Sequence, residues 1–188
     1  EGGVAWDYLM AQAERTPPGA EGVLFLPHFS GSLFPVVDPH SMGAFIGLRN
    51  THGKGHLVRA MIEGLAYQFA QMIHGLRGAL GVTANRFVTV GGGAQNQFWM
   101  QAKADLLGLP FETPQIEEAT PLGAAILAGL GVGLYRDEQE AFDRVFRPGR
   151  VFEPNLKLTA QYAERFAIFE QLYPALKHMN AALRKIDA

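Results

Sequence analysis

The sequence predicts an α/β domain with a small mixed sheet packed with helices. Short apolar runs of strand length alternate along the chain with longer segments in which apolar residues recur every three or four positions. This alternation is typical of layered domains in which helices cover a sheet. The chain has 188 residues, 48% of them apolar, which is enough for one domain with a substantial core.

The first part of the chain predicts one short helix and two short strands. Residues 2–14 are expected to form the helix, because a Thr-Pro-Pro-Gly run at 16–19 then interrupts any helical pattern. Two apolar runs, 23–26 and 44–48, have the length of strands, and the loop between them is rich in proline, glycine and serine.

A long helix is predicted from Gly55 to Leu80, and Gly81 lies where a helix usually ends. Its large apolar residues recur at helical spacing, which predicts that this face of the helix belongs to the core. The residues of this stripe are Val58, Met61, Leu65, Phe69, Met72 and Leu76.

The second half of the chain continues the alternation. Pro174 lies inside the last predicted helix and is expected to kink it. The stretch that begins at Pro148 is predicted to be a connector up to residue 154. The predicted strands are 87–90 and 109–113, and the predicted helices are 96–107, 120–130, 137–145 and 158–183.

The composition excludes several classes of protein. With 16 basic and 18 acidic residues, a net charge of −2 and no basic stripe, the chain lacks the electrostatic signature of a nucleic-acid-binding protein. The lack of cysteine excludes disulfides, thiolate metal sites and a cysteine nucleophile, and it fits a cytoplasmic location. No apolar run is long enough to span a membrane, and the six histidines lack metal-ligand spacing.

The strongest local feature is the predicted turn between the strand 87–90 and the next helix. Three consecutive glycines, Gly91 to Gly93, bring bare backbone N–H groups to the rim of the sheet, where a flat ring or a phosphate could lie against the chain. Asn96 at the helix start could cap the helix or hydrogen bond to the edge of a base. A tight strand-to-helix turn without a ligand explains the glycines equally well.

A Rossmann-like dinucleotide-binding fragment is a second interpretation of the same turn. Gly91 and Gly93 match two of the three glycines of the G-x-G-x-x-G pattern, and Glu112 lies near the distance expected for a ribose-binding acid. The third glycine is replaced by Asn96, at a position that requires close packing between helix and strand. The match is therefore incomplete.

A second group of motifs surrounds the start of the long helix. Gly43-Ala44-Phe45-Ile46-Gly47-Leu48 is followed by seven residues and then by His56-Leu57-Val58-Arg59-Ala60-Met61-Ile62-Glu63. This stretch resembles the C-terminal signature of the FGGY family of carbohydrate kinases. Further motifs agree in order: Asp38-Pro39, Gly91-Gly92-Gly93-Ala94, Trp99-x-Gln101, Leu122-Gly123-Ala124-Ala125 and, as in xylulokinase-like members, Leu172-Tyr173-Pro174-Ala175-Leu176.

The resemblance implies that residues 1–188 form the C-terminal, nucleotide-binding lobe of a two-lobe kinase. Such lobes have the ribonuclease H-like fold of actin-like ATPases, with ATP and sugar in the cleft between the two lobes. The aspartate that acts as general base belongs to the N-terminal lobe, which would precede Glu1. We therefore expect no catalytic residue and no metal ligand in this chain. The expected cofactors are ATP and Mg²⁺, with the metal held by the ATP phosphates and the other lobe.

By resemblance, the lobe would serve a kinase that transfers the γ-phosphoryl group of ATP to a hydroxyl of a small sugar or polyol, and the chain alone would be inactive. Gly92, Gly93 and Ala94 are assigned to the adenosine face, and Asn96 to a contact with the base edge. The expected partners are ATP, the sugar or polyol, the N-terminal lobe and, in a homodimer, a second copy of the chain. A noncatalytic actin-like interaction lobe is a further alternative.

Three conspicuous polar residues are interpreted as structural. His56 is expected to cap its helix, Glu63 to pair with Arg59, and Asp38 to order its loop through an Asx turn.

One departure from the family pattern concerns the substrate, because Ser32-Leu33 replaces a Glu-Arg pair that many members carry. The choice among ketopentose, deoxysugar and polyol is therefore not predicted.

Overall fold

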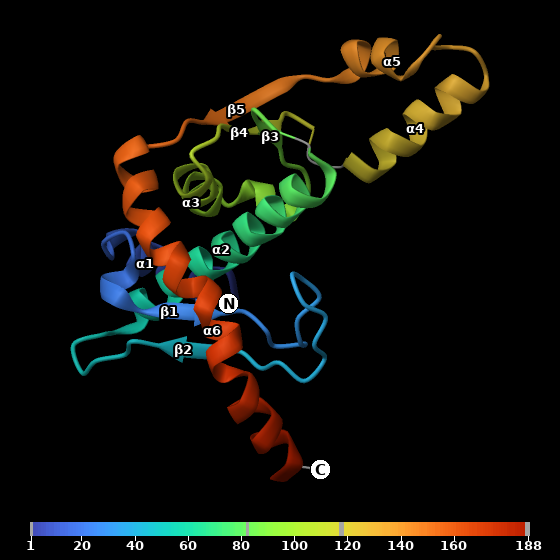
Figure 1. Cartoon of the computed structure of the whole chain (residues 1–188). Coiled ribbons are helices and arrows are strands. Elements are labelled where there is room, and N and C mark those ends of the chain that lie inside the picture. Colours follow the sequence, from blue (N-terminus) through green and yellow to red (C-terminus); the bar gives the residue numbers. More distant parts are fainter. Residues whose placement is uncertain (1, 82, 117–118, 187–188) are drawn as a thin grey trace.

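The computed structural model describes residues 2–81, 83–116 and 119–186 (Figure 1). Within these ranges no helix is long and apolar enough to cross a membrane. Helices and short strands alternate along the chain. The elements are α1 (Gly2–Arg15), β1 (Leu24–Leu26), β2 (Ala44–Ile46), α2 (Lys54–Leu80), β3 (Phe87–Val88), α3 (Gln97–Leu107), β4 (Phe111–Pro114), α4 (Ala119–Gly131), α5 (Glu138–Val145), β5 (Pro148–Phe152) and α6 (Leu156–Ile186).

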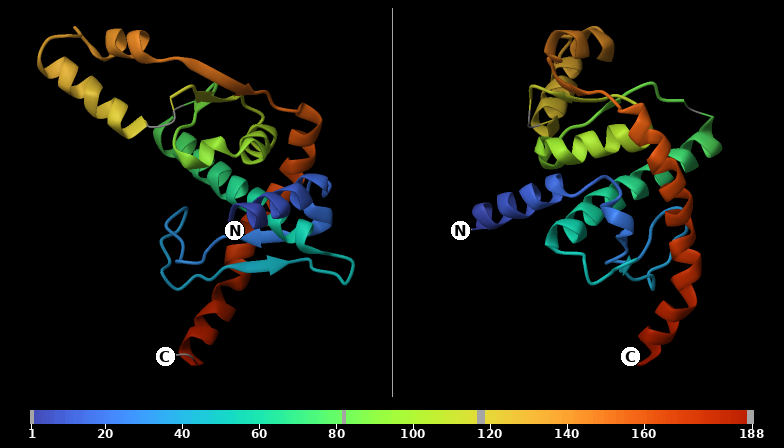
Figure 2. Two further views of the ribbon diagram at one scale, coloured as in Figure 1. Left: turned by 180° about the vertical axis from the view of Figure 1, so that it is seen from behind. Right: turned by 90° about the vertical axis from the view of Figure 1, so that its left-hand side faces the viewer.

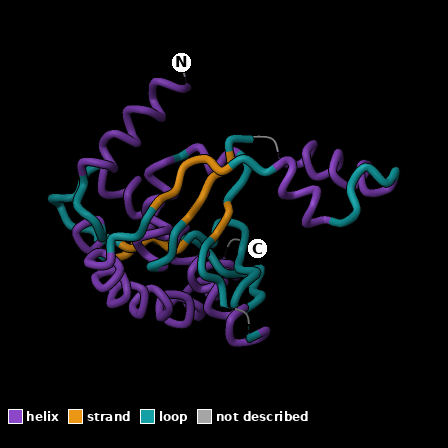
Figure 3. The backbone as a smooth tube through the Cα atoms, turned by 90° about the horizontal axis from the view of Figure 1, so that it is seen from above, coloured by secondary structure: helices purple, strands orange, loops and turns teal. Residues whose placement is uncertain are grey.

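The strands form two small sheets. β1 and β2 are an antiparallel pair in which Phe25 lies opposite Phe45. The second sheet has the order β3–β4–β5, with β3 parallel and β5 antiparallel to β4. Figure 3 shows the strands of this sheet side by side from above. The predicted α/β class with a small mixed sheet is confirmed, although the strands divide between two sheets.

Strand β5 shows that the connector predicted from Pro148 onward is wrong. Phe152 of β5 lies opposite Phe111 of β4, and both side chains are buried. Pro148 is the first residue of an edge strand, where the missing N–H costs little. At Gly149 the strands are so close that a Cβ would collide with the carbonyl oxygen of Thr113. Because proline and glycine are typical of loops, the sequence pattern did not indicate this strand, which forms through its packing on β4.

Helix α2 lies at the centre of the molecule and contacts α1, α3, α6 and β1 (Figure 2). The largest core cluster lies where β1, α2 and α6 meet, and aromatic rings dominate it. The ring of Tyr67 stacks on that of Phe169 with 5.2 Å between centroids, a separation typical of favourable aromatic pairs. The buried members are Leu24, Leu26, Ala66, Tyr67, Ala70, Leu106, Tyr162, Phe166, Phe169 and Leu172.

The apolar stripe predicted as the core face of α2 is wrong for most of its length. Met61, Leu65, Met72 and Leu76 are each more than a third exposed. The buried face of the helix instead carries mostly small or polar residues. They are Gly55, Arg59, Ala60, Ile62, Glu63, Gly64, Ala66, Tyr67 and Ala70.

Close backbone contacts explain why this face of α2 is buried. A Cβ at Gly64 would collide with the carbonyl oxygen of Phe25 in β1. At Gly55, a Cβ would lie 2.6 Å from the carbonyl oxygen of Gln12 in α1, far inside van der Waals contact. Only residues without a side chain allow β1 and α1 to pack this closely on the helix. Four large apolar residues, Met61, Leu65, Met72 and Leu76, therefore lie on the other face.

A buried ion pair joins α2 to α6 and to the turn after α1. Arg59 Nε donates to Glu63 Oε1 over 2.7 Å, and both side chains are less than a tenth exposed. The same carboxylate oxygen accepts from the Tyr162 hydroxyl at 2.8 Å and from the Gly19 N–H at 3.0 Å. Burial and the charge of Glu63 raise the pKa of Tyr162, which keeps the phenol a donor. The predicted pairing of Glu63 with Arg59 is confirmed.

Two parts of the chain project from this body. Helices α4 and α5 form an arm at one end, and the C-terminal part of α6 extends past β2 at the other (Figures 1 and 2). α4 packs on α5. Helix α6 continues through Pro174 to Ile186, and the kink expected at Pro174 stays a prediction.

Removing one member of the buried ion pair should destabilise the fold strongly. Arg59→Met leaves the Glu63 carboxylate buried without its cation, and we expect the free energy of unfolding to fall by about 3–5 kcal/mol. Urea denaturation followed by circular dichroism measures the change. Arg136→Met is the matched control, because Arg136 pairs with Glu140 at the same spacing on the surface. Equal losses in the two variants would contradict the role assigned to the network.

Candidate functional site

The glycine turn connects β3 to α3 through a short 3₁₀ helix, Gly92–Gln95. Within it, the N–H of Ala94 donates to the carbonyl of Gly91 over 2.9 Å. Gly91 has a φ of 87°, in the left-handed region that favours glycine. Position 91 therefore requires glycine for the path of the backbone itself, independently of any ligand.

The larger of two hollows beside this turn, which we name the α1 hollow, lies between the turn and helices α1, α2 and α3. Its volume of about 590 Å³ is in the range of small-molecule sites. Three predicted site residues, Gly92, Gly93 and Asn96, line it together. The full lining is Trp6, Met10, Glu14, Ile62, Leu65, Gly92, Gly93, Gln95, Asn96, Gln97, Phe98 and Trp99.

The smaller hollow, which we name the sheet hollow, lies on the β4–β5 side of the turn and has a volume of about 190 Å³. Ala94, the fourth predicted site residue, lines this hollow and not the α1 hollow. The predicted set is therefore divided by the turn. The sheet hollow is lined by Thr89, Val90, Gly91, Ala94, Gln95, Gln97, Thr113, Pro114, Gln115, Ile116, Arg150 and Phe152.

The glycines of the turn differ in how much open space lies beside them. A Cβ added at Gly91 or Gly92 would meet no atom within 4 Å. At Gly93 the same atom would lie 2.8 Å from Cζ3 of Trp99. Gly92 therefore borders open space, whereas the indole ring of Trp99 packs against Gly93.

Asn96 caps helix α3. Its Oδ1 accepts from the backbone N–H of Trp99 over 3.0 Å, which satisfies one of the free N–H groups at the helix start. Its Nδ2 lies 4.0 Å from the sulfur of Met10 in α1. Of the two roles that the sequence left open, capping is the one seen in the structure, and Nδ2 is the atom still suited to a base edge.

Two elements of the α1 hollow were not found from the sequence. Trp6 and Met10 of α1 face it one helical turn apart, and Phe98 and Trp99 contribute from the first turn of α3. The i, i+4 spacing in α1 is the only sequence signal for the first pair, and it also occurs in ordinary core helices. The side chains enclose the hollow with apolar and aromatic surface on which a flat ring could lie.

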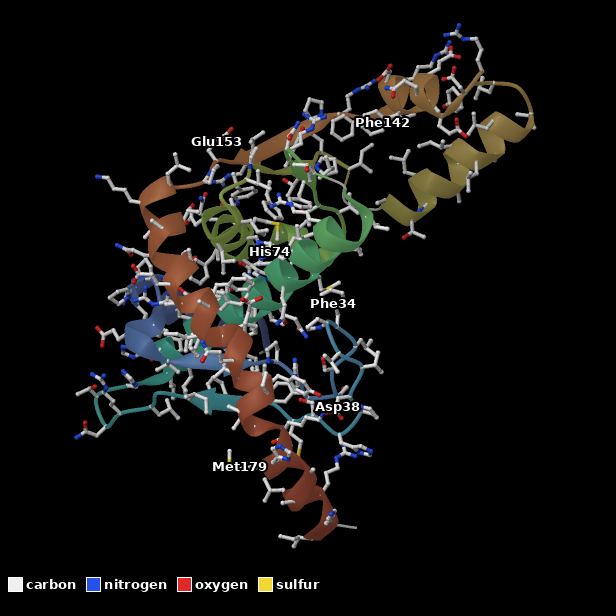
Figure 4. All side chains as sticks on the ribbon, in the orientation of Figure 1. Phe34, Asp38, His74, Phe142, Glu153 and Met179 are labelled. Atoms are coloured by element: carbon white, nitrogen blue, oxygen red, sulfur yellow. The ribbon has the colours of Figure 1, made fainter. Side chains whose placement is uncertain are left out.

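The polar residues interpreted as structural have structural roles. His56 Nδ1 accepts from the N–H of Gly53 over 3.0 Å at the start of α2. Asp38 lies on the loop between β1 and β2 (Figure 4), where its Oδ1 accepts from the N–H of His40 over 2.9 Å. That bond and one from the Tyr173 hydroxyl hold the pKa of Asp38 below its usual value. The helix-capping and Asx-turn predictions are confirmed.

Glu112 does not suit the role of a ribose-binding acid. Its side chain is 7% exposed, and Oε2 accepts from Arg86 Nη1 over 3.3 Å. Neither hollow includes it in its lining. The geometry therefore removes Glu112 from the support for the dinucleotide interpretation, which then rests on the glycine turn alone.

The part of the chain that the structure describes contains no group of three His, Cys, Asp or Glu side chains placed to hold a metal ion. The residues lining the α1 hollow include one carboxylate, that of Glu14. The donor set of this lobe alone therefore does not fit a Mg²⁺ ion, and no chemical step is assigned to a metal held by these residues.

The family model described as the FGGY family of carbohydrate kinases, C-terminal domain, matches residues 5–132. The chain belongs to the FGGY family of carbohydrate kinases. This matched range includes the signature from Gly43 to Glu63, the glycine turn and the whole lining of the α1 hollow.

Individual FGGY relatives match nearly the whole chain. It is 32% identical to the xylulose kinase of Staphylococcus epidermidis over 97% of its residues. The crystal structure of xylulose kinase from Rhodospirillum rubrum covers 96% of it with a TM-score of 0.84 and 30% identity. The crystal structure of Plasmodium falciparum glycerol kinase with ADP covers 90% with a TM-score of 0.73 and 26% identity. The chain spans 36% of the length of each.

The capping role of Asn96 leads to a stability prediction. Asn96→Ala should lower the free energy of unfolding by about 1 kcal/mol, because an N–H of α3 loses its acceptor. Asn96→Asp keeps the acceptor and should remain close to the unsubstituted protein. Urea denaturation of both variants measures the difference. If Asn96→Ala were as stable as Asn96→Asp, the cap would contribute nothing to stability.

Proposed function

We propose that this chain is the nucleotide-binding, actin-like lobe of an ATP-dependent carbohydrate kinase, with the purine of ATP in the α1 hollow. The observation that carries the proposal is the open space beside Gly92, within a hollow large enough for a nucleoside. Family membership gives the chemical class, and the S. epidermidis and R. rubrum relatives are named xylulose kinases.

The walls of the α1 hollow suit a purine. Trp6, Phe98 and Trp99 offer aromatic surface, and the backbone at Gly92 leaves room for a ring edge to approach the peptide groups. The Nδ2 of Asn96 can donate to a ring nitrogen while Oδ1 remains in the helix cap. The Plasmodium falciparum glycerol kinase, solved with ADP, is consistent with nucleotide use in the family.

The lobe's contribution to the reaction would be positioning. Phosphoryl transfer depends on aligned phosphates, bound Mg²⁺ and a base that accepts the proton of the attacking hydroxyl. We assign the base and the metal contacts to a partner lobe and to the ATP phosphates. Closure of the two lobes over the substrates would exclude water and limit ATP hydrolysis. The acceptor is a small sugar or polyol.

A noncatalytic interaction lobe is the competing function. The kinase lobe and the noncatalytic lobe differ in ligand binding and in turnover by the full-length protein. A kinase lobe binds ADP and ATP in preference to NAD and supports sugar-dependent ADP formation when the rest of the kinase is present. This chain alone should show no such turnover, and measurable sugar phosphorylation by it would contradict the two-lobe proposal.

Gly92→Val tests the placement of the nucleotide. The branched side chain would fill the space beside the turn, and we expect the KM for ATP of the full-length kinase to rise at least about 10-fold. Gly78→Val is the matched control, because a Cβ at Gly78 also meets no atom within 4 Å but lies far along α2. A folded Gly92→Val enzyme with unchanged KM for ATP would place the nucleotide elsewhere.

A further inference from the structure

Lys103 is a buried lysine whose neighbour Trp99 lines the proposed nucleotide site. It lies in α3, one turn after Trp99, and is 7% exposed. A lysine is almost never buried to this extent without a specific partner. None of the roles described above uses it, and it lines neither hollow.

The partners of Lys103 are aromatic. Its Nζ lies 3.9 Å from the ring centroid of Trp99 and 5.4 Å from that of Phe69. Both separations are within the range of cation–π attraction, and the contact with tryptophan is the strongest kind. The i, i+4 spacing in α3 places Lys103 and Trp99 on the same face of the helix.

Trp99 connects this contact to the glycine turn. The six-membered ring of its indole lies against Gly93, since a Cβ there would be 2.8 Å from Cζ3 and 3.5 Å from Cε3. The same side chain lines the α1 hollow. Any movement of the indole would therefore change both the support of the turn and the wall of the hollow.

We propose that Lys103 is a positioning residue for the nucleotide, because its charge holds the Trp99 indole against Gly93 and so keeps the α1 hollow in its binding shape. The inference rests on the proposed function and adds a residue that does not itself touch the nucleotide. The chain of contacts is Lys103 to Trp99, Trp99 to Gly93, and Gly93 to the neighbouring backbone at Gly92.

The ionisation of Lys103 is consistent with this role. Burial lowers its pKa to about 8, so the amine is still mostly protonated at pH 7. Charged side chains on the packed elements α2, β4 and α3 have partners of their own: Arg59 pairs with Glu63, Glu112 with Arg86, and Asp105 with Gln101. The charge of Lys103 is thus available to the aromatic faces.

The test measures ADP binding to the full-length protein by calorimetry. Lys103→Met keeps the apolar stem and removes the charge, and we expect the Kd for ADP to rise about 3- to 10-fold. Lys103→Arg keeps a cation for the tryptophan face and should restore the Kd to within about two-fold. Lys177→Met is the matched control, because Lys177 lies 5.9 Å from the ring centroid of Tyr173, outside both hollows.

A spectroscopic readout separates positioning from general destabilisation. Trp6 and Trp99 are the two tryptophans of this chain, so the emission of a Trp6→Phe variant of the 188-residue chain, measured without the rest of the kinase, reports on Trp99. Lys103→Met should shift this emission in the folded protein, and Lys103→Arg should shift it less. For the enzyme, KM for ATP should rise while kcat at saturating ATP stays the same.

The outcomes are distinguishable. If the unsubstituted protein does not bind ADP, the proposed function fails. If it binds ADP and folded Lys103→Met shows an unchanged Kd and unchanged Trp99 emission, the positioning role is overturned and the proposed function stands. Should Lys103→Met not fold, Lys103→Gln is judged by the same criteria, since it keeps a polar end on a long stem.

Discussion

The close approach of α1 and β1 to one face of α2 is the constraint on which the rest of the structure depends. Gly55 and Gly64 allow backbones to touch the helix where any side chain would separate them. The buried Arg59–Glu63 pair then links this face to α6 and to the turn after α1. Because a buried charge without its partner is costly, the three segments are held in one arrangement.

The α1 hollow is a consequence of this packing. With the small face of α2 used by α1 and β1, Leu65 on the exposed side of the helix and Ile62 on its buried face become part of the wall. Helix α1 supplies the opposite wall through Trp6 and Met10. The site thus combines a local feature, the glycine turn, with walls that exist only because three helices meet.

Much of the fold was predictable from local pattern. Of the elements that the structure describes, the helices and four of the five strands were predicted close to their observed positions, because helical spacing, glycine and proline report directly on the backbone. β5 and the buried face of α2 were not predicted. Both depend on how closely another backbone approaches, at Gly149 and at Gly64, and a single sequence contains no pattern for that distance.

The sequence by itself determined the family, the class of fold and the glycine turn, because these follow from motifs and from the conformational freedom of residues close together in the chain. Only the tertiary structure decided that Ala94 faces away from Gly92, that Asn96 caps α3, and that Lys103 lies over Trp99. Those facts depend on which side of a turn or helix is covered, and that side is set by contacts between segments far apart in sequence.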